Sequence, residues 1–167
     1  TDRVLVQGIT GGEGSFWTKH MIDMGTTVVA GVTPGKAGQS VEGVPVFNTV
    51  RDAVCKTKAD ASVLFVPPAF AKDAVFEALD AGIRKIVVTA EGMPVHDAMD
   101  VRSAALELRA SIIGPNTTGA ITPGKAMMGF IPYWIDRVYK PGTVGVLTKS
   151  GSLTNEVTAM VIKAGLG

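Results

Sequence analysis

The sequence predicts an α/β protein built on a Rossmann-like, doubly wound parallel sheet. Short apolar runs of strand length alternate along the chain with amphipathic stretches of helix length. The apolar runs are continuous and do not alternate in polarity, which is typical of strands buried on both faces. The first run also leads directly into a glycine-rich loop and a helical pattern, as nucleotide-binding sheets of this class begin.

The expected elements follow one another in a steady strand–helix order. Glycine and proline mark many of their ends, because both residues interrupt regular structure. Asn48 is expected to cap the second helix, since a side-chain oxygen before a helix accepts a free backbone N–H. The expected strands cover residues 4–9, 27–32, 62–66, 85–89 and 111–113, and the expected helices cover 15–24, 49–57, 72–81 and 97–109.

The alternation of strands and helices ends after residue 113. Residues 114–142 contain four prolines and no long periodic segment, so we expect a covering segment with one hairpin at 127–131. A strand at 143–148 and a helix at 153–164 then restart the pattern. We expect a nucleotide-binding domain at 1–124, a linker at 125–142, and the start of a second, incomplete flavodoxin-like domain at 143–167. The alternative is that the last strand joins the first sheet.

Composition limits the class of protein. The chain has 167 residues, 46% of them hydrophobic, which suits one domain with a sizeable core and a part of another. Its 16 basic and 15 acidic residues give no general bias toward nucleic acid or membrane. The single cysteine, Cys55, excludes an internal disulfide and fits a reducing compartment. With no long apolar run and no signal-peptide pattern, we expect a cytoplasmic or organelle-matrix protein.

The glycine-rich loop predicts a phosphate-binding site. Gly8, Gly11 and Gly14 follow the first expected strand and open a helix. Glycine allows a close backbone approach to a ligand, and a helix N-terminus presents free N–H groups and a partial positive charge. The spacing is G-x-x-G-x-x-G and therefore differs from the dinucleotide fingerprint G-x-G-x-x-G. Such a loop by itself is also compatible with a plain tight turn.

The loop after the second expected strand narrows the class of ligand. A dinucleotide-binding protein usually has Asp or Glu there for the ribose hydroxyls, but this loop has Lys36. A lysine attracts a phosphate on the ribose, so NAD is disfavoured. NADP and coenzyme A (CoA), both phosphorylated on the adenosine ribose, remain. The alternative is an ordinary solvated loop lysine.

Other expected strand ends converge on the same edge of the sheet, where ligands bind in this fold class. Thr89 and Glu91 follow one strand and Asn116 follows the next. Their side chains are able to bond ligand amides or hydroxyls.

Five strings carry a family resemblance: GVTPGK at 31–36, GVPVFNTV at 43–50, TAEG at 89–92, IGPN at 113–116 and ITPG at 121–124. In this order they resemble the α subunit of succinyl-CoA synthetase and related NDP-forming acid–CoA ligases, which include malate–CoA ligase, citryl-CoA synthetase and ATP-citrate lyase. The likeness covers nearly the whole chain. It implies that residues 1–124 bind CoA. The implied CoA contacts are Thr10, Gly11, Gly12 and Glu13 in the phosphate loop, Lys36 at the nucleotide, and Thr89, Ala90 and Glu91.

The resemblance also implies a reaction. In the family a nucleoside triphosphate phosphorylates a histidine, the phosphoryl group moves to a carboxylic acid, and the CoA thiol attacks the acyl phosphate. A β subunit with an ATP-grasp domain, in a heterodimer or heterotetramer, would hold ATP or GTP with Mg²⁺. Ser150, Gly151 and Ser152 resemble the helix start that cradles the phosphoryl group. His20 and His96 do not match the active histidine, so no catalytic residue is expected in this chain and it is expected to be inactive alone.

Two positions depart from the family pattern. Thr117 replaces a cysteine that follows Gly-Pro-Asn, and Asn155 replaces a tyrosine of the succinate enzymes. Asn155 is therefore a candidate substrate contact and points to a hydroxylated or tricarboxylic acid; the alternative is a diverged paralogue. No His, Cys and carboxylate cluster has the spacing of a metal site. The competing functions are a non-catalytic CoA- or nucleotide-binding regulatory module and, last, an NADP-dependent dehydrogenase.

Overall fold

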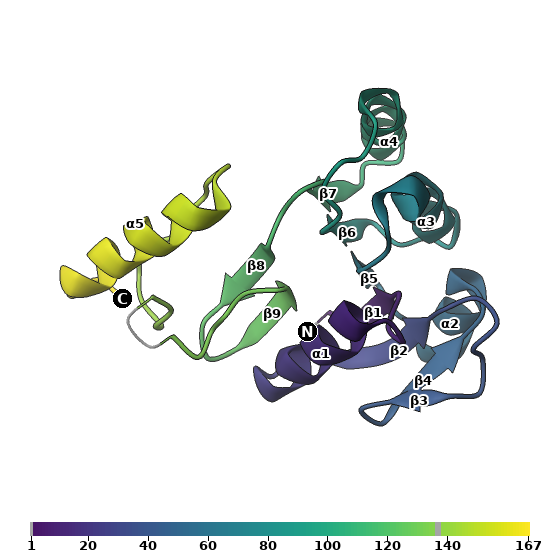
Figure 1. The fold of residues 1–167 in the computed structure, drawn as a ribbon, viewed down its shortest axis with the longest axis horizontal. Coiled ribbons are helices and arrows are strands. Elements are labelled where there is room, and N and C mark those ends of the chain that lie inside the picture. The colour runs from purple at the N-terminus through teal and green to yellow at the C-terminus, as the bar shows by residue number, and fades with distance from the viewer. Residues whose placement is uncertain (1, 136–137) are drawn as a thin grey trace.

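The computed structural model describes residues 2–135 and 138–167 (Figure 1). A seven-stranded sheet has the order β3-β4-β2-β1-β5-β6-β7 and is parallel except at the β3–β4 pair. The Rossmann-like fold class is confirmed. The strands are β1 Val4–Gln7, β2 Val28–Val32, β3 Ser40–Val41, β4 Val44–Phe47, β5 Ala61–Leu64, β6 Lys85–Val88 and β7 Ser111–Ile113.

Helices cover both faces of the sheet. They are α1 Gly12–Asp23, α2 Val50–Thr57, α3 Pro68–Asp80 and α4 Val95–Glu107. In β1, Leu5 joins a buried cluster with residues of α2, α3 and α4, whereas Val4 and Val6 join a second cluster with Met21 of α1. All four residues of β1 are buried, which is why the apolar run in the sequence is continuous.

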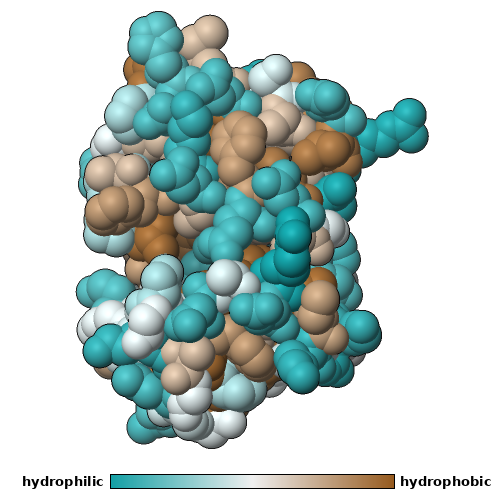
Figure 2. Space-filling model, turned by 90° about the vertical axis from the view of Figure 1, so that its right-hand side faces the viewer, coloured by the Kyte–Doolittle hydropathy of each residue, from teal (hydrophilic) through white to brown (hydrophobic). Residues whose placement is uncertain are grey.

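The β3–β4 ribbon at the edge of the sheet is not apparent from the sequence. β3 has two residues, and β4 contains Pro45. Proline cannot donate to a strand ladder, so it weakens the sequence pattern and is confined to edge positions or bulges. On the face that carries α2, α3 and this ribbon, hydrophilic and hydrophobic side chains are intermixed (Figure 2). Hydrophobic side chains are visible in a hollow between the upper and lower halves of this view.

An antiparallel hairpin of β8 (Gly119–Thr122) and β9 (Ala126–Gly129) lies beside α1. The expected hairpin at 127–131 is therefore misplaced, because the turn is at Gly124, where φ is +73°, and Lys125 donates its N–H to the Thr122 carbonyl. Thr26 attaches the hairpin to the sheet domain. Its buried hydroxyl donates to the Met127 carbonyl at 2.7 Å and accepts from the Met127 N–H at 2.9 Å.

The chain beyond the hairpin differs from the expectation at one element. Residues 143–148 are not a strand and do not join the seven-stranded sheet. A strand requires a neighbouring ladder, and within residues 2–135 and 138–167 no segment provides one. Helix α5 (Gly151–Lys163) follows as expected, and none of its residues is buried. It lies across the hairpin from the sheet (Figure 1).

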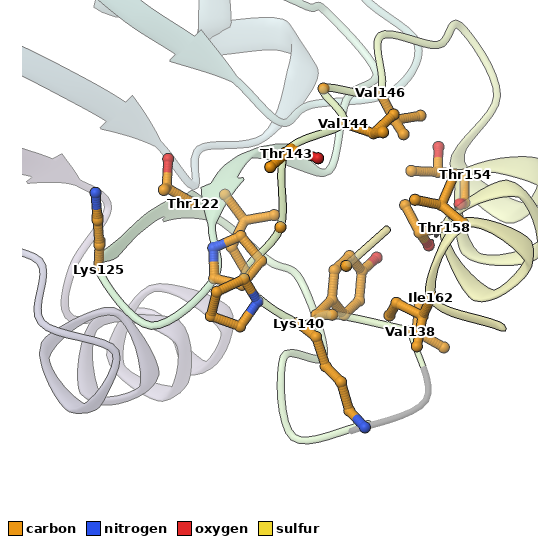
Figure 3. A pocket seen from close by; sticks show the side chains of 18 residues that line it. Thr122, Lys125, Val138, Lys140, Thr143, Val144, Val146, Thr154, Thr158 and Ile162 are labelled. Carbon is orange, nitrogen blue, oxygen red and sulfur yellow. Dashed lines mark hydrogen bonds between the residues drawn. The ribbon is translucent and has the colours of Figure 1, made fainter. Parts of the chain in front are cut away.

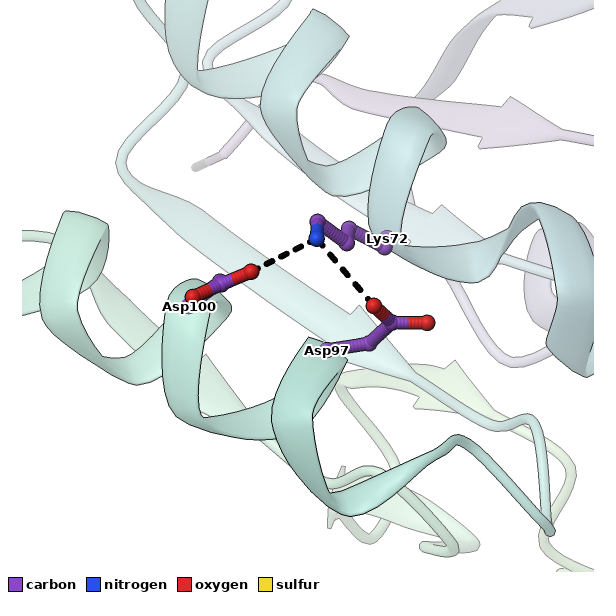
Figure 4. A network of polar contacts seen from close by, with 3 residues as sticks. All are labelled: Lys72, Asp97 and Asp100. Atoms are coloured by element: carbon purple, nitrogen blue, oxygen red, sulfur yellow. Dashed lines mark hydrogen bonds and ion pairs between the residues drawn. The ribbon is translucent and has the colours of Figure 1, made fainter.

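A three-residue polar network joins α3 to α4. Lys72 Nζ lies 3.1 Å from Asp97 Oδ1 and 2.6 Å from Asp100 Oδ2 (Figure 4). The hydrogen bond to Asp100 and then that to Asp97 raise the pKa of Lys72 above its ordinary value of 10.5. The protonated lysine is therefore the form that the folded protein favours.

We expect Thr26→Val to destabilise the protein. Valine keeps the shape but leaves the buried N–H and carbonyl of Met127 without their partner, at a cost of about 2–4 kcal/mol. Urea unfolding measures the difference. Thr27→Val, at the adjacent exposed position, is the matched control and should change the free energy of unfolding by less than about 0.5 kcal/mol. Equal effects of the two changes would contradict the role of Thr26.

We expect Lys72→Met to lower stability at neutral pH but not in strong alkali. Because the folded-state pKa of Lys72 is raised, its contribution is fully present below the unfolded-chain value of about 10.5 and is lost as the pH rises through the folded-state pKa. The difference between the urea midpoints of wild type and variant should therefore shrink as the pH rises above about 10.5. Lys19→Met, on the exposed side of α1, serves as the control. A midpoint difference that is constant with pH would disprove the linkage.

Candidate nucleotide-binding site

Three backbone segments meet where β1 ends. Gly8 has a φ of +78°, and a Cβ built on it would lie 2.2 Å from the carbonyl oxygen of Phe65. A Cβ on Gly14, in the first turn of α1, would lie 2.1 Å from the carbonyl oxygen of Gly8. Gly11 donates its N–H to that same oxygen at 3.0 Å. The glycines therefore allow the N-terminus of α1 to start directly beside the end of β1.

The outer side of this turn is open. A Cβ built on Gly12 would meet no atom within 4 Å, and Gly11, Gly12 and Glu13 are all exposed. Gly11 is the N-cap and provides no side-chain acceptor for the first-turn N–H groups. Such an end is suited to an anion, because the free amides and the helix dipole both favour negative charge.

Hydrogen bonds connect this loop to the loop that carries Lys36. The Thr10 hydroxyl donates to the Thr33 hydroxyl at 3.1 Å, across the ends of β1 and β2. Lys36 is exposed, and its N–H donates to the Thr33 carbonyl at 3.1 Å. Asn48 Oδ1 accepts the N–H of Ala37 at 3.1 Å. The predicted lysine thus lies in a loop that is held at both ends.

The role expected for Asn48 is wrong. Thr49 caps α2 instead, since its hydroxyl accepts the N–H of Asp52 at 3.1 Å. Asn48 is one residue too early for this contact, and its side-chain oxygen bonds to Ala37. The family-like string at 43–50 therefore serves the Lys36 loop as well as the helix.

A cavity of about 570 Å³ opens beside the two loops. Most of its wall is hydrophobic, from Val32, Pro34, Phe65, Val66, Pro67 and Phe70. Thr10 and Gly11 reach its rim. Asp73 and Glu77 add negative charge, and Glu77 Oε1 accepts the Val50 N–H at 2.8 Å, at the N-terminus of α2.

Sequence reasoning missed the wall residues Phe70, Asp73 and Glu77. One signal was present for Phe70. It lies in the first turn of α3 and is 63% exposed, because it falls outside the buried stripe that includes Ala71 and Val75. A large exposed aromatic residue at the edge of a ligand crevice is a candidate contact.

The residues expected further along the edge follow β6. Thr89 donates its hydroxyl to the Leu64 carbonyl at 2.6 Å, Ala90 is 8% exposed, and Glu91 is exposed. The Asn116 N–H donates to the Ala90 carbonyl at 2.8 Å. These residues share the carboxyl edge of the sheet with the loops after β1 and β2 but do not line the cavity.

The residues expected on α5 form a separate group. Ser150 caps the helix by accepting the Leu153 N–H at 3.3 Å, and Asn155 Oδ1 accepts the Tyr139 hydroxyl at 2.5 Å. Burial raises the pKa of the Tyr139 phenol above its ordinary value of 10.0, which favours the protonated form that donates this bond. A Cβ built on Gly151 would lie 3.8 Å from Cγ2 of Thr118, so the helix start approaches the chain that follows β7.

A second cavity, of about 390 Å³, lies between α5 and the segments that lead to it from the hairpin (Figure 3). Threonine and valine side chains from residues 143–146 and from α5 point into it, and Lys125 and Lys140 lie at its margin (Figure 3). None of the predicted site residues lines it.

Neither histidine resembles a nucleophile. His20 packs among aromatic rings, with centroids 4.5 Å from Phe16 and 4.9 Å from Trp134. His96 is exposed at the start of α4. In the described part of the chain, no group of three His, Cys, Asp or Glu side chains is placed to hold a metal ion. Over the same residues, no helix is both long and apolar enough to cross a membrane.

The parallel sheet, the glycine turn at the start of α1 and the lysine-bearing second loop define a Rossmann-type nucleotide-binding domain. Residues 1–92 match the family model described as the CoA binding domain. The chain belongs to this family, and the resemblance inferred from the sequence is confirmed.

Proteins named as subunits of ADP-forming acid–CoA ligases are similar to this chain. The chain is 62% identical over 165 residues to the ADP-forming sulfoacetate-CoA ligase subunit SqwL of an Acholeplasma species, and 48% identical over 165 residues to the succinate–CoA ligase [ADP-forming] subunit alpha 1 of Archaeoglobus fulgidus. Each match covers 99% of this chain and 56% of the relative, so the chain spans about half the length of these proteins.

A solved structure has the same fold. It is the ATP citrate lyase of Methanothrix soehngenii in complex with citrate and coenzyme A, with a TM-score of 0.83 and 26% sequence identity. The match covers 97% of this chain and 29% of the lyase chain.

Two alanine substitutions in the first turn of α1 should differ in their effect on stability, because one faces a backbone oxygen and the other faces open space. Gly14→Ala places a methyl group 2.1 Å from a backbone oxygen, so we expect a loss of at least about 3 kcal/mol in the free energy of unfolding. Gly12→Ala meets nothing and should change that energy by less than about 1 kcal/mol. Urea unfolding of both variants checks this. Comparable destabilisation by the two would argue against the tight turn.

Proposed function

We propose that this chain is the CoA-binding part of the α subunit of an ADP-forming acid–CoA ligase. The observation that carries the proposal is Lys36, which lies where an NAD-binding protein has a carboxylate and in a loop that is hydrogen-bonded to the glycine turn. The match to the CoA binding domain and the relatives named above support the same ligand.

The charges of the site suggest how the ligand lies. The amides of Gly12 and Glu13, at the exposed turn that Gly11 opens, are suited to the diphosphate, and Lys36 to the phosphate on the ribose. The cavity beside them is mainly hydrophobic and carries two carboxylates, so it favours the adenine ring over a phosphate. Thr89, Ala90 and Glu91 then remain for the pantetheine arm, further along the same edge of the sheet.

The remaining steps belong to other parts of the ligase. We propose that residues 1–124 form the CoA-binding domain, that 125–142 link it onward, and that 143–167 begin the second domain. The amides of Gly151 and Ser152, behind the Ser150 cap, would hold the transferred phosphoryl group. The phosphorylated histidine is neither His20 nor His96. A β subunit with an ATP-grasp domain would supply ATP or GTP with Mg²⁺, in a heteromeric enzyme of the cytoplasm or an organelle matrix.

Two observations suggest which carboxylic acid the ligase joins to CoA. The departure at Asn155 suggests a di- or tricarboxylic acid that carries an extra polar group. Because the chain is more similar to the sulfoacetate-CoA ligase subunit than to the succinate–CoA ligase subunit, sulfoacetate is a second candidate. A coupled assay of ADP release by the assembled ligase, with succinate, malate, citrate and sulfoacetate, decides between them. No turnover with any acid, together with retained CoA binding, would favour the regulatory module instead.

We expect Lys36→Ala to weaken CoA binding by about 10-fold, because a charge-assisted contact to the ribose phosphate is lost. Dephospho-CoA lacks that phosphate, so its dissociation constant should change by less than about 2-fold. Isothermal titration calorimetry measures both. Lys56→Ala removes the same charge from the last turn of α2 and serves as the control. A folded wild-type protein that does not bind CoA would overturn the proposed function, whereas equal losses for both ligands would overturn only the role of Lys36.

A further inference from the structure

The surface beside the glycine turn carries a cluster of six aromatic side chains, which we call the aromatic cluster. Trp17 lies at its centre, with its ring nearly parallel to that of Trp134 at an interplanar angle of 13° and a centroid distance of 5.8 Å. The rings of Phe16 and Trp17 form a T-shaped pair with their centroids 5.1 Å apart. The members of the cluster are Phe16, Trp17, His20, Phe130, Tyr133 and Trp134.

Trp17 contacts the phosphate loop directly. Its indole Nε1–H donates to Glu13 Oε2 at 2.9 Å, one helical turn away along α1. Glu13 is exposed in the first turn of this helix, next to the Gly12 amide, and the N-cap Gly11 offers no side-chain acceptor to the first turn. In the described residues no lysine or arginine forms an ion pair with Glu13. The indole N–H is thus the side-chain donor that holds this carboxylate.

A carboxylate at this position competes with a bound phosphate. The helix N-terminus attracts negative charge, so a free Glu13 carboxylate in the first turn would be drawn toward the same amides. Two negative groups a few ångströms apart near the protein surface also repel each other. The bond to Trp17 draws the carboxylate toward the second turn of the helix, which leaves the amides open.

We propose that Trp17 is a positioning residue that holds Glu13 away from the anion-binding end of α1. The proposal rests on the proposed function, since the anion is taken to be the diphosphate of CoA. The aromatic cluster fixes the indole in place: Trp134, from the segment after the hairpin, covers one face of the ring, and Phe16 packs on it from within the helix.

Trp17→Phe tests the role, because it keeps an aromatic ring in the cluster and removes the N–H donor. Calorimetric titration with CoA should show binding about 3- to 10-fold weaker than in wild type. The double variant Trp17→Phe with Glu13→Gln should recover most of the affinity, since the released side chain then carries no charge. Glu13→Gln alone is the reference for the double variant: in that background Trp17→Phe should change the dissociation constant by less than about 2-fold, because no carboxylate is left to release.

Trp134→Phe is the matched control. It alters the aromatic cluster from the other face of the indole but leaves the Nε1–H bond to Glu13 in place, so CoA affinity should stay within about 2-fold of wild type. A purely structural role of Trp17 predicts the opposite pattern, in which Trp134→Phe also weakens binding and Glu13→Gln rescues nothing. If Trp17→Phe does not fold, replacement of Trp17 by benzothienylalanine removes the N–H with the ring shape unchanged.

The outcomes are distinct. Unchanged CoA affinity in folded Trp17→Phe, or a loss that Glu13→Gln does not reverse, would overturn the role of Trp17 while the proposed function stands. Absence of CoA binding in folded wild-type protein would overturn both.

Discussion

The site depends on one close contact between backbones. Gly8 passes within van der Waals distance of the chain after β5, and α1 starts against the carbonyl of Gly8. No side chain fits at either point, so both positions require glycine. This contact places a helix N-terminus at the carboxyl edge of a parallel sheet, which is where ligands of this fold class bind. Every other part of the site is arranged around that end.

Few charged side chains lie around this end, and those named below each contact a different group. Lys36 lies in a loop held by Thr33 and Asn48, and it has no acidic partner among the ion pairs of the described residues. Glu13 is bonded to an indole, and Glu77 to the amide at the start of α2. A ligand with separated phosphates and a flat apolar ring matches this distribution better than a uniformly charged one. Specificity for CoA would then depend on the uncharged surfaces of the site as much as on its positive charge.

The sequence predicted those features that depend on local chemistry. Gly8 and Gly14 were predicted because a tight turn restricts the residue type. The role of Lys36 stays a prediction, based on a lysine in place of a carboxylate. Asn48 and the β3–β4 ribbon were misjudged or missed, because their partners at Ala37 and across the ribbon are set by tertiary contacts. Phe70 was missed for the same reason, since its helix pattern shows only that it is not in the core. Residues 143–148 have the composition of a strand, but composition does not provide the neighbour that a strand needs.

One helix N-terminus lies at the edge of the sheet and a second lies near the chain that follows β7, and this arrangement suggests how binding and chemistry are connected. The start of α1 lies at the end of β1, and the start of α5 comes close to Thr118, beyond β7. A ligand that extends along the edge from Lys36, past Thr89, would bring its far end toward the Ser150 cap. CoA has this form, with its phosphates at one end and its thiol at the other. On the proposed function, the CoA-binding part would act mainly by orientation: it would hold the charged end of the ligand so that the reactive end is presented to the helix proposed to hold the phosphoryl group.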